Sequence, residues 1–213
     1  MNNIFFSIEP KDLTPDISET ARYLGYKKSS VIEEQIKDLI SKAQTEMGKL
    51  IKPQGVYEIF PITNITQLDN DSKPTYKISF ADIVITTKDL GYNLKDCNKV
   101  CLLAGTIGPL TDSYIRKQSM RDPAFGSICQ ATGAMYIEAF IDSLNNHIKE
   151  LANSENEDTM PRYSPGYGDV DLSFQKEFFR LLNCKRIGLS LMDTLIMAPE
   201  KSVTAFIGLK ERK

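Results

Sequence analysis

Hydrophobic residues recur at helical spacing in two long stretches of the chain. In the first stretch, from Ser30 toward Ile51, apolar residues repeat every three or four positions, and Ser30 followed by Glu33 fits a capping box at a helix start. In the second, from about Asp122 to Leu151, one apolar stripe comprises Phe125, Cys129, Ile137, Phe140, Leu144, Ile148 and Leu151. We therefore expect two long helices, each with one face in the core.

Shorter segments complete the pattern. Shorter helices are expected over about 16–25, from about 110 onward, and over 174–183. Strands are expected at 4–8, 56–63, 76–80, 100–108, 187–191 and 202–209. The segments 56–63 and 76–80 flank turn-forming residues and predict an antiparallel pair, whereas the unbroken apolar run 100–108 predicts a strand buried on both faces.

The order of these elements indicates the fold class. Strands and helices do not alternate regularly, which favours an α+β fold with a twisted, mainly antiparallel sheet and flanking helices. The chain of 213 residues is long enough for one substantial core, so we expect a single domain, 1–213. The polar, acidic segment 152–161 predicts a surface loop or a break between lobes, and the segment 198–201 predicts a turn.

Composition narrows the class of protein. Hydrophobic residues make up 41% of the chain and charged residues 25%, which is ordinary for a globular protein. No apolar run reaches the roughly 20 residues of a membrane span, and the N-terminus has no secretory leader, so we expect no membrane contact and a cytoplasmic location. A net charge of -2 argues against a nucleic-acid partner.

Few residues offer nucleophilic or metal chemistry. The chain has a single histidine, His147, which we expect to be solvated at a helix end, so catalysis through a histidine is disfavoured. The spacing of the four cysteines does not indicate a metal site, and we expect buried, reduced thiols at Cys97, Cys101, Cys129 and Cys184. Neither GxGxxG nor GxxxxGK[ST] is present, so no nucleotide cradle of those kinds is predicted.

The segment RYSPGYGD, residues 162–169, has the composition of a binding loop. Arg162 has a planar charged fork suited to a carboxylate or phosphate, and the two tyrosines offer faces for a planar ring. Pro165 fixes its own φ, while Gly166 permits a close approach of a ligand to the backbone. A structural role remains open, in which Arg162 ties the loop down through backbone carbonyls.

Glu138 is the second candidate residue. Its helical neighbours, Ala134, Met135, Ile141 and Asp142, wall one side of the carboxylate with small and apolar groups. A partly buried acid needs a partner, because desolvation of an unpaired charge is costly. The alternative is a boundary glutamate that reaches into water.

The loop also carries a family resemblance. RYSPGYGD is followed by FFRLL, IGLSL, MAPEKS and SVTAF, and preceded by LLAGTIGP, AMYIEAFIDSL and, more loosely, RYLGYK. In this order the segments resemble the activation domain of cobalamin-dependent methionine synthase. The resemblance implies a C-shaped α+β fold around a twisted antiparallel sheet that binds S-adenosylmethionine.

The resemblance also implies the binding residues. Arg162, Gly166 and Tyr167 match the RxxxGY binding residues of that family, Pro165 completes the RxxPGY core, and Glu138 matches an acidic binding residue. Arg162 would take the ligand carboxylate and Glu138 its cationic groups, so we expect Glu138 to face Arg162 and Tyr167 across one pocket. A family aspartate near the N-terminus has no definite match here, and the family tyrosine beyond the last strand has no counterpart.

The implied function is reductive reactivation in methionine biosynthesis, with no catalytic acid, base or nucleophile from this chain. S-adenosylmethionine and an electron donor such as flavodoxin or ferredoxin would restore methylcobalamin from cob(II)alamin. No DxHxxG motif is present, so the cobalamin would be held by a partner, either a corrinoid protein or a methionine synthase core. The alternative is a docking or regulatory subunit of a corrinoid methyltransferase system that no longer binds S-adenosylmethionine. An ordinary methyltransferase would need a parallel sheet and a glycine-rich first turn.

Overall fold

The computed structural model describes residues 2–27 and 29–212, so both ends of the predicted domain, 1–213, lie outside the described residues. Its strands are β1 (Ile4–Ser7), β2 (Gln54–Gln67), β3 (Tyr76–Phe80), β4 (Ile83–Thr87), β5 (Lys99–Thr106), β6 (Glu157–Thr159), β7 (Ser190–Leu191), β8 (Met197–Ala198) and β9 (Ser202–Glu211). Its α-helices are α1 (Ile17–Tyr23), α2 (Glu34–Gly48), α3 (Asp89–Leu94), α4 (Pro109–Arg121), α5 (Pro123–Ser154) and α6 (Gln175–Leu181). Short 3-10 helices span Pro10–Asp12, Leu172–Phe174 and Cys184–Ile187.

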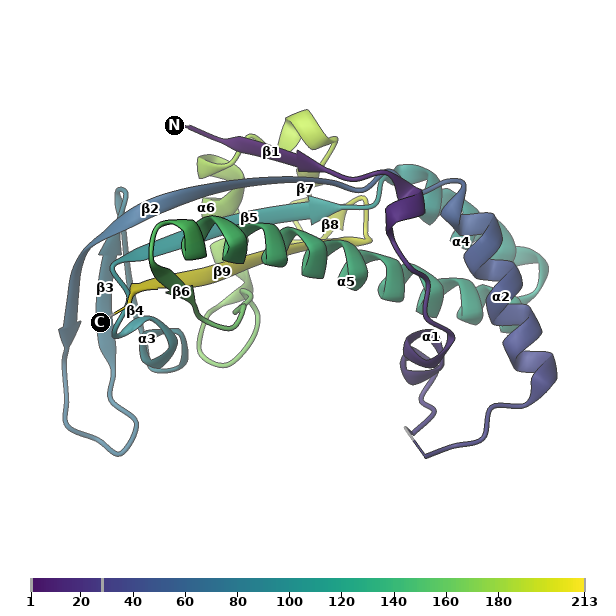
Figure 1. The fold of residues 1–213 in the computed structure, drawn as a ribbon, viewed down its shortest axis with the longest axis horizontal. Coiled ribbons are helices and arrows are strands. Elements are labelled where there is room, and N and C mark those ends of the chain that lie inside the picture. Colours follow the sequence, from purple (N-terminus) through teal and green to yellow (C-terminus); the bar gives the residue numbers. More distant parts are fainter. Residues whose placement is uncertain (1, 28, 213) are drawn as a thin grey trace.

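A seven-stranded antiparallel sheet forms the centre of the fold. Its strand order is β4-β3-β2-β5-β9-β6, and β1 also pairs with β2. The strands arch across the molecule, α5 runs along them, and α1, α2 and α4 gather at one end (Figure 1). The predicted α+β class with a mainly antiparallel sheet is confirmed.

Strand alternation divides the core into two layers. On β5, Cys101 and Leu103 pack into the layer that contains α5, whereas Val100 and Leu102 pack into the layer that contains α6. On β9, Ile207 packs into the layer that contains α5, and Phe206 packs into the layer that contains α6. Because successive side chains of a strand point to opposite faces, the predicted burial of the segment 100–108 on both faces follows from helices on both sides of the sheet.

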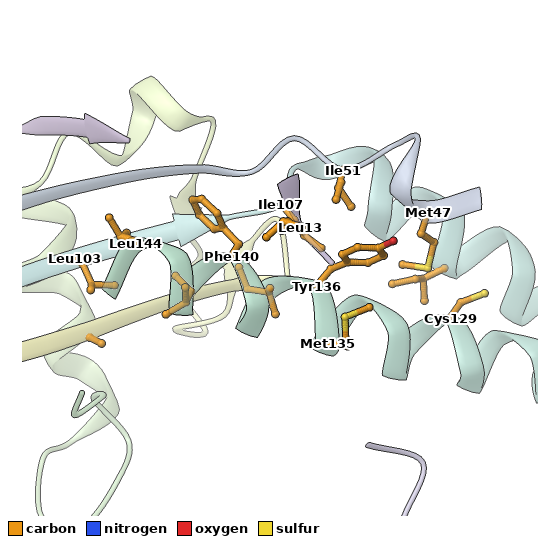
Figure 2. Packing of buried hydrophobic residues seen from close by; sticks show 14 of the residues in the cluster. Leu13, Met47, Ile51, Leu103, Ile107, Cys129, Met135, Tyr136, Phe140 and Leu144 are labelled. Atoms are coloured by element: carbon orange, nitrogen blue, oxygen red, sulfur yellow. The ribbon is translucent and has the colours of Figure 1, made fainter. Parts of the chain in front are cut away.

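Helix α5 lies close to the sheet because two glycines face it. Gly55 and Gly105 are paired across β2 and β5, and a Cβ at Gly105 would lie 3.0 Å from a ring carbon of Phe140 and 2.6 Å from the Cδ1 atom of Ile141. Phe140 is fully buried and points from α5 toward the strands (Figure 2). The missing side chains therefore make room for Phe140, Ile141 and Leu144 of the helix.

The apolar stripe predicted for the second long helix is confirmed over most of its length. Phe125 to Ile148 are buried at the predicted positions, and the Asp122 side chain caps the helix by accepting hydrogen bonds from the backbone N–H groups of Ala124 and Phe125. Leu151, placed in the stripe, is 36% exposed, so the buried face ends before it.

The predicted start of the first long helix was wrong. Helix α2 begins at Glu34, and Glu33 makes no side-chain capping bond. The Ser30 hydroxyl instead accepts a hydrogen bond from the Lys27 backbone N–H, and Val31 is 91% exposed. The capping box fails because its first apolar residue has no core to contact.

Other boundaries also differ from the predictions. The segment 152–161 is not a plain loop: it holds the last turn of α5 and the edge strand β6, in which Glu157 is buried and bonded to Lys99 at 3.0 Å. The predicted strand 187–191 shrinks to β7, and α3 and β4 were not predicted. No helix within the described residues has the length and apolar character to cross a membrane.

Candidate functional site

The loop 162–169 is fixed by its pairing with β9. Tyr163 and Phe206 exchange two backbone hydrogen bonds of 3.0 and 2.7 Å, which extends the edge pairing that begins at β6. The Tyr163 side chain packs into the layer containing Phe206 and α6. Because neighbouring residues of an extended chain point to opposite faces, Arg162 is directed to the face on which α5 lies.

Arg162 meets two carboxylates of α5. Its Nη2 atom lies 3.4 Å from Oε2 of Glu138 and 2.8 Å from Oδ1 of Asp142. These acids are four residues apart and therefore share one face of the helix. Arg162 Nη1 is buried, and no residue of the described chain accepts a hydrogen bond from it. The structure thus brings Glu138 and Arg162 together, and both acceptors found for the guanidinium are carboxylates, not the backbone carbonyls of the structural alternative.

The turn after Arg162 is closed by its own hydrogen bonds. The Gly166 backbone N–H donates to the Val170 carbonyl at 2.8 Å, and the Tyr163 hydroxyl donates to the Tyr167 carbonyl at 2.8 Å. Pro165 is buried, and Gly166 has a φ of 89°, a left-handed value that favours glycine. The Tyr167 side chain is 71% exposed at the tip, so the backbone is held while the ring is free to contact a ligand.

Asp169 anchors the far end of the loop, a role that the sequence analysis missed. Its carboxylate accepts hydrogen bonds from the Thr87 hydroxyl and from the backbone N–H groups of Lys88 and Asp89, at the start of α3. Burial favours the neutral acid, but these hydrogen bonds outweigh it and lower the pKa of the Asp169 carboxyl. The residue ends the motif RYSPGYGD, which is the only signal in the sequence that could have pointed to it.

Helix α1 closes the other side of the site. Burial, and then the negative charge of Glu138, raise the pKa of the Tyr23 phenol. A hollow of about 400 Å³ lies between α1 and α5 and is lined by Tyr23, Leu24, Ser127, Gln130, Ala131 and Ala134. Glu138, whose side chain is 44% exposed, lies one helical turn after Ala134 on the same face of α5 but does not line this hollow.

A second hollow lies elsewhere on the molecule. It has a volume of about 750 Å³, between β1 and the segment 179–191, and its lining includes Phe5, Leu182 and Leu189. Its arginine, Arg180, is already bound to Asp82 and Glu177. None of the predicted binding residues lines this larger hollow or the smaller one beside Tyr23.

Histidine and cysteine chemistry lies outside this site. His147 is half-buried, and its Nε2 atom lies 3.1 Å from the Tyr57 hydroxyl, so the expectation of a solvated histidine was wrong. The four cysteines are free and buried, as predicted. Burial raises the pKa of the Cys97 thiol to about 11, which keeps it protonated near neutral pH. The part of the chain that the structure describes has no group of three or more His, Cys, Asp or Glu side chains that could hold a metal ion.

Comparison with known proteins gives a match in structure only. A scan against protein-family models found no match, and neither did a search of the curated proteins. Among solved structures, the chain is similar to the MetH reactivation domain bound to AdoHcy, with a TM-score of 0.69 and 18% sequence identity. The match covers 98% of this chain and 78% of that chain. The chain therefore has the fold of the MetH reactivation domain.

Proposed function

We propose that the chain binds S-adenosylmethionine between the loop 162–169 and α5. There it would support the reductive remethylation of cobalamin on a separate corrinoid protein. The observation that carries this proposal is the contact of Arg162 with the α5 carboxylates, beside a turn with Gly166 at positive φ. The similar MetH domain was solved with AdoHcy bound, which supports the same ligand class.

The residues fit the ligand group by group. S-adenosylmethionine has a carboxylate for Arg162 and an ammonium group for Glu138, and charge-assisted hydrogen bonds of this kind are the stronger ones. The buried Nη1 atom of Arg162 has no acceptor among the described residues, and the ligand carboxylate would provide one. The exposed ring of Tyr167 offers a stacking surface for adenine, and Pro165 and Gly166 shape the backbone beneath it.

The chemistry would come from the ligand and the partner. When bound, S-adenosylmethionine would supply the methyl group of its sulfonium and leave as the neutral thioether S-adenosylhomocysteine, and the partner's cobalt, reduced by one electron from the donor protein, would accept the methyl group. This chain would bind and orient the donor and exclude wrong geometries, a proximity effect that needs no acid, base or nucleophile. We place the cobalamin on a corrinoid protein or a methionine synthase core that lacks an activation domain, with flavodoxin or ferredoxin as the electron source.

Titration of the protein with S-adenosylmethionine by calorimetry tests the binding step. Heat with a micromolar Kd supports the proposal, and its absence favours the docking subunit without a ligand. A second assay adds the chain to a methionine synthase core without an activation domain, in the cob(II)alamin state, with a chemical reductant. Recovery of methyl transfer only with both the chain and S-adenosylmethionine supports reactivation in trans.

Arg162→Ala is expected to weaken S-adenosylmethionine binding by about 1.5–3 kcal/mol, because a charged hydrogen-bonded pair with the ligand carboxylate is lost. Calorimetry measures the affinity and circular dichroism the fold. Arg180→Ala is the control. Arg180 lies on α6 and forms exposed ion pairs with Asp82 and Glu177, so its replacement should leave the affinity unchanged. An Arg162 variant that binds like the parent protein would return this residue to a structural role.

Glu138→Gln is expected to weaken binding by about 1–3 kcal/mol, because the shape of the side chain is kept while the counter-charge for the ligand ammonium is removed. The helix should remain intact in circular dichroism. Glu177→Gln, in another arginine pair, serves as the control. Equal affinities of the Glu138 variant and the parent protein would place the ligand cation somewhere else.

A further inference from the structure

Asp142 is a third charged residue at the proposed site. Its Oδ1 atom lies 2.8 Å from Arg162 Nη2, closer than the Glu138 carboxylate at 3.4 Å. Asp142 follows Glu138 by four residues, so both carboxylates project from one face of α5 toward the loop. The shorter contact indicates that Asp142 holds the guanidinium, which leaves Glu138 the more available of the two acids.

The local charges do not balance. One guanidinium, that of Arg162, meets two carboxylates, so the formal charges of the three groups sum to -1. On α1, Arg22 and Glu19 form an ion pair at 2.9 Å and together add no formal charge. Tyr23 adds no charge, because its phenol pKa is raised. Among these described residues, one negative charge is therefore left uncompensated.

We propose that Asp142 makes the site prefer S-adenosylmethionine over S-adenosylhomocysteine, an inference that rests on the proposed function. Both ligands have a carboxylate for Arg162 and an ammonium group for Glu138. They differ by the sulfonium, which gives S-adenosylmethionine one more positive charge. With Asp142 paired to Arg162, the cluster has one negative charge more than the guanidinium compensates. That excess attracts the sulfonium and offers nothing to the uncharged thioether, so the demethylated product is released more readily than the methyl donor.

The size of the effect follows from the exposure of Asp142. Its side chain is 66% exposed, so the dielectric constant of water applies. At a separation of about 6 Å in that medium, the attraction between two unit charges changes an equilibrium constant roughly threefold. Salt screens charges over a Debye length of about 10 Å at 0.1 M, so the preference should shrink as the ionic strength rises.

Calorimetry with both ligands tests the inference in the full chain and in Asp142→Asn. We expect the substitution to reduce the affinity for S-adenosylmethionine roughly threefold more than the affinity for S-adenosylhomocysteine. Asp142→Glu, which restores the charge, should restore the ratio of the two affinities. Glu150→Gln is the control, because it removes an exposed acid from the same helix about 12 Å further along its axis.

The outcomes separate this inference from the proposed function. If the parent protein binds neither ligand, the proposed function fails and the inference fails with it. If the parent protein binds S-adenosylmethionine but Asp142→Asn leaves the affinity ratio unchanged, the inference alone is overturned. An equal loss for both ligands overturns it as well, because Asp142 would then only position Arg162.

Discussion

Phe140→Ala is expected to lower the free energy of unfolding by about 3–5 kcal/mol, because it opens a cavity between α5 and the sheet. The Phe140 ring is fully buried opposite Gly55 and Gly105, where neither glycine has a side chain to fill the space. Phe6 stacks against it with a centroid distance of 6.1 Å. The ring therefore joins the helix to β1, β2 and β5.

Chemical denaturation monitored by circular dichroism measures this loss. Phe179→Ala provides the comparison, because Phe179 is only partly buried against the opposite layer and should cost less than half as much. Phe140 lies between Glu138 and Asp142 on α5, so the same variant should also weaken ligand binding. A loss below about 1 kcal/mol would mean that the helix is held on the sheet by other contacts.

Periodicity predicts α5 well because the signal is long and local. The stripe from Phe125 to Ile148 spans many turns, and Asp122 provides a recognisable cap. The same reasoning failed at Ser30, where the cap and the apolar residues are present but Val31 faces water. A capping box describes what a chain segment can do, and only the surrounding surfaces decide whether it does so.

The contacts that define the site join distant parts of the sequence. Arg162 reaches Glu138 across 24 residues because the β6 edge and Tyr163 pair with β9, a pairing hidden in a segment that reads as an acidic loop. Asp169 reaches Thr87 across 82 residues, and His147 reaches Tyr57 across 90. Local patterns carry no information on such partners. Spacing alone therefore did not decide whether Glu138 is paired or reaches into water, and only the family resemblance indicated a binding role for it.

Helical spacing could have predicted that Asp142 belongs to the site. It lies four residues after Glu138, and a second acid at i+4 on the same helix face would also reach a partner of Glu138. Its contact with Arg162 is the shorter of the two. The sequence thus places both acids on one helix face, but only the structure, in which Arg162 points toward α5, shows that both contact one guanidinium.

Gly166→Val is expected to reduce S-adenosylmethionine affinity by about 100-fold or more, so that calorimetry detects no binding. Gly166 has a φ of 89°, which a β-branched residue adopts only with strain. A Cβ atom there would lie 3.1 Å from Leu172 Cδ1 and would also occupy the backbone surface that a ligand would approach. In this variant, either the turn that holds Tyr167 should open, or the valine side chain should block the ligand.

Gly188→Val separates loss of the site from general strain. Gly188 also has a left-handed φ, 68°, and a Cβ there would meet no atom within 4 Å, in a loop after the 3-10 helix Cys184–Ile187. Both variants impose backbone strain of about 1–3 kcal/mol on folding, but only Gly166→Val lies beside Arg162 and Tyr167. Binding that disappears in both variants would reflect lowered stability, and binding retained by a folded Gly166→Val protein would show that this turn does not cradle the ligand.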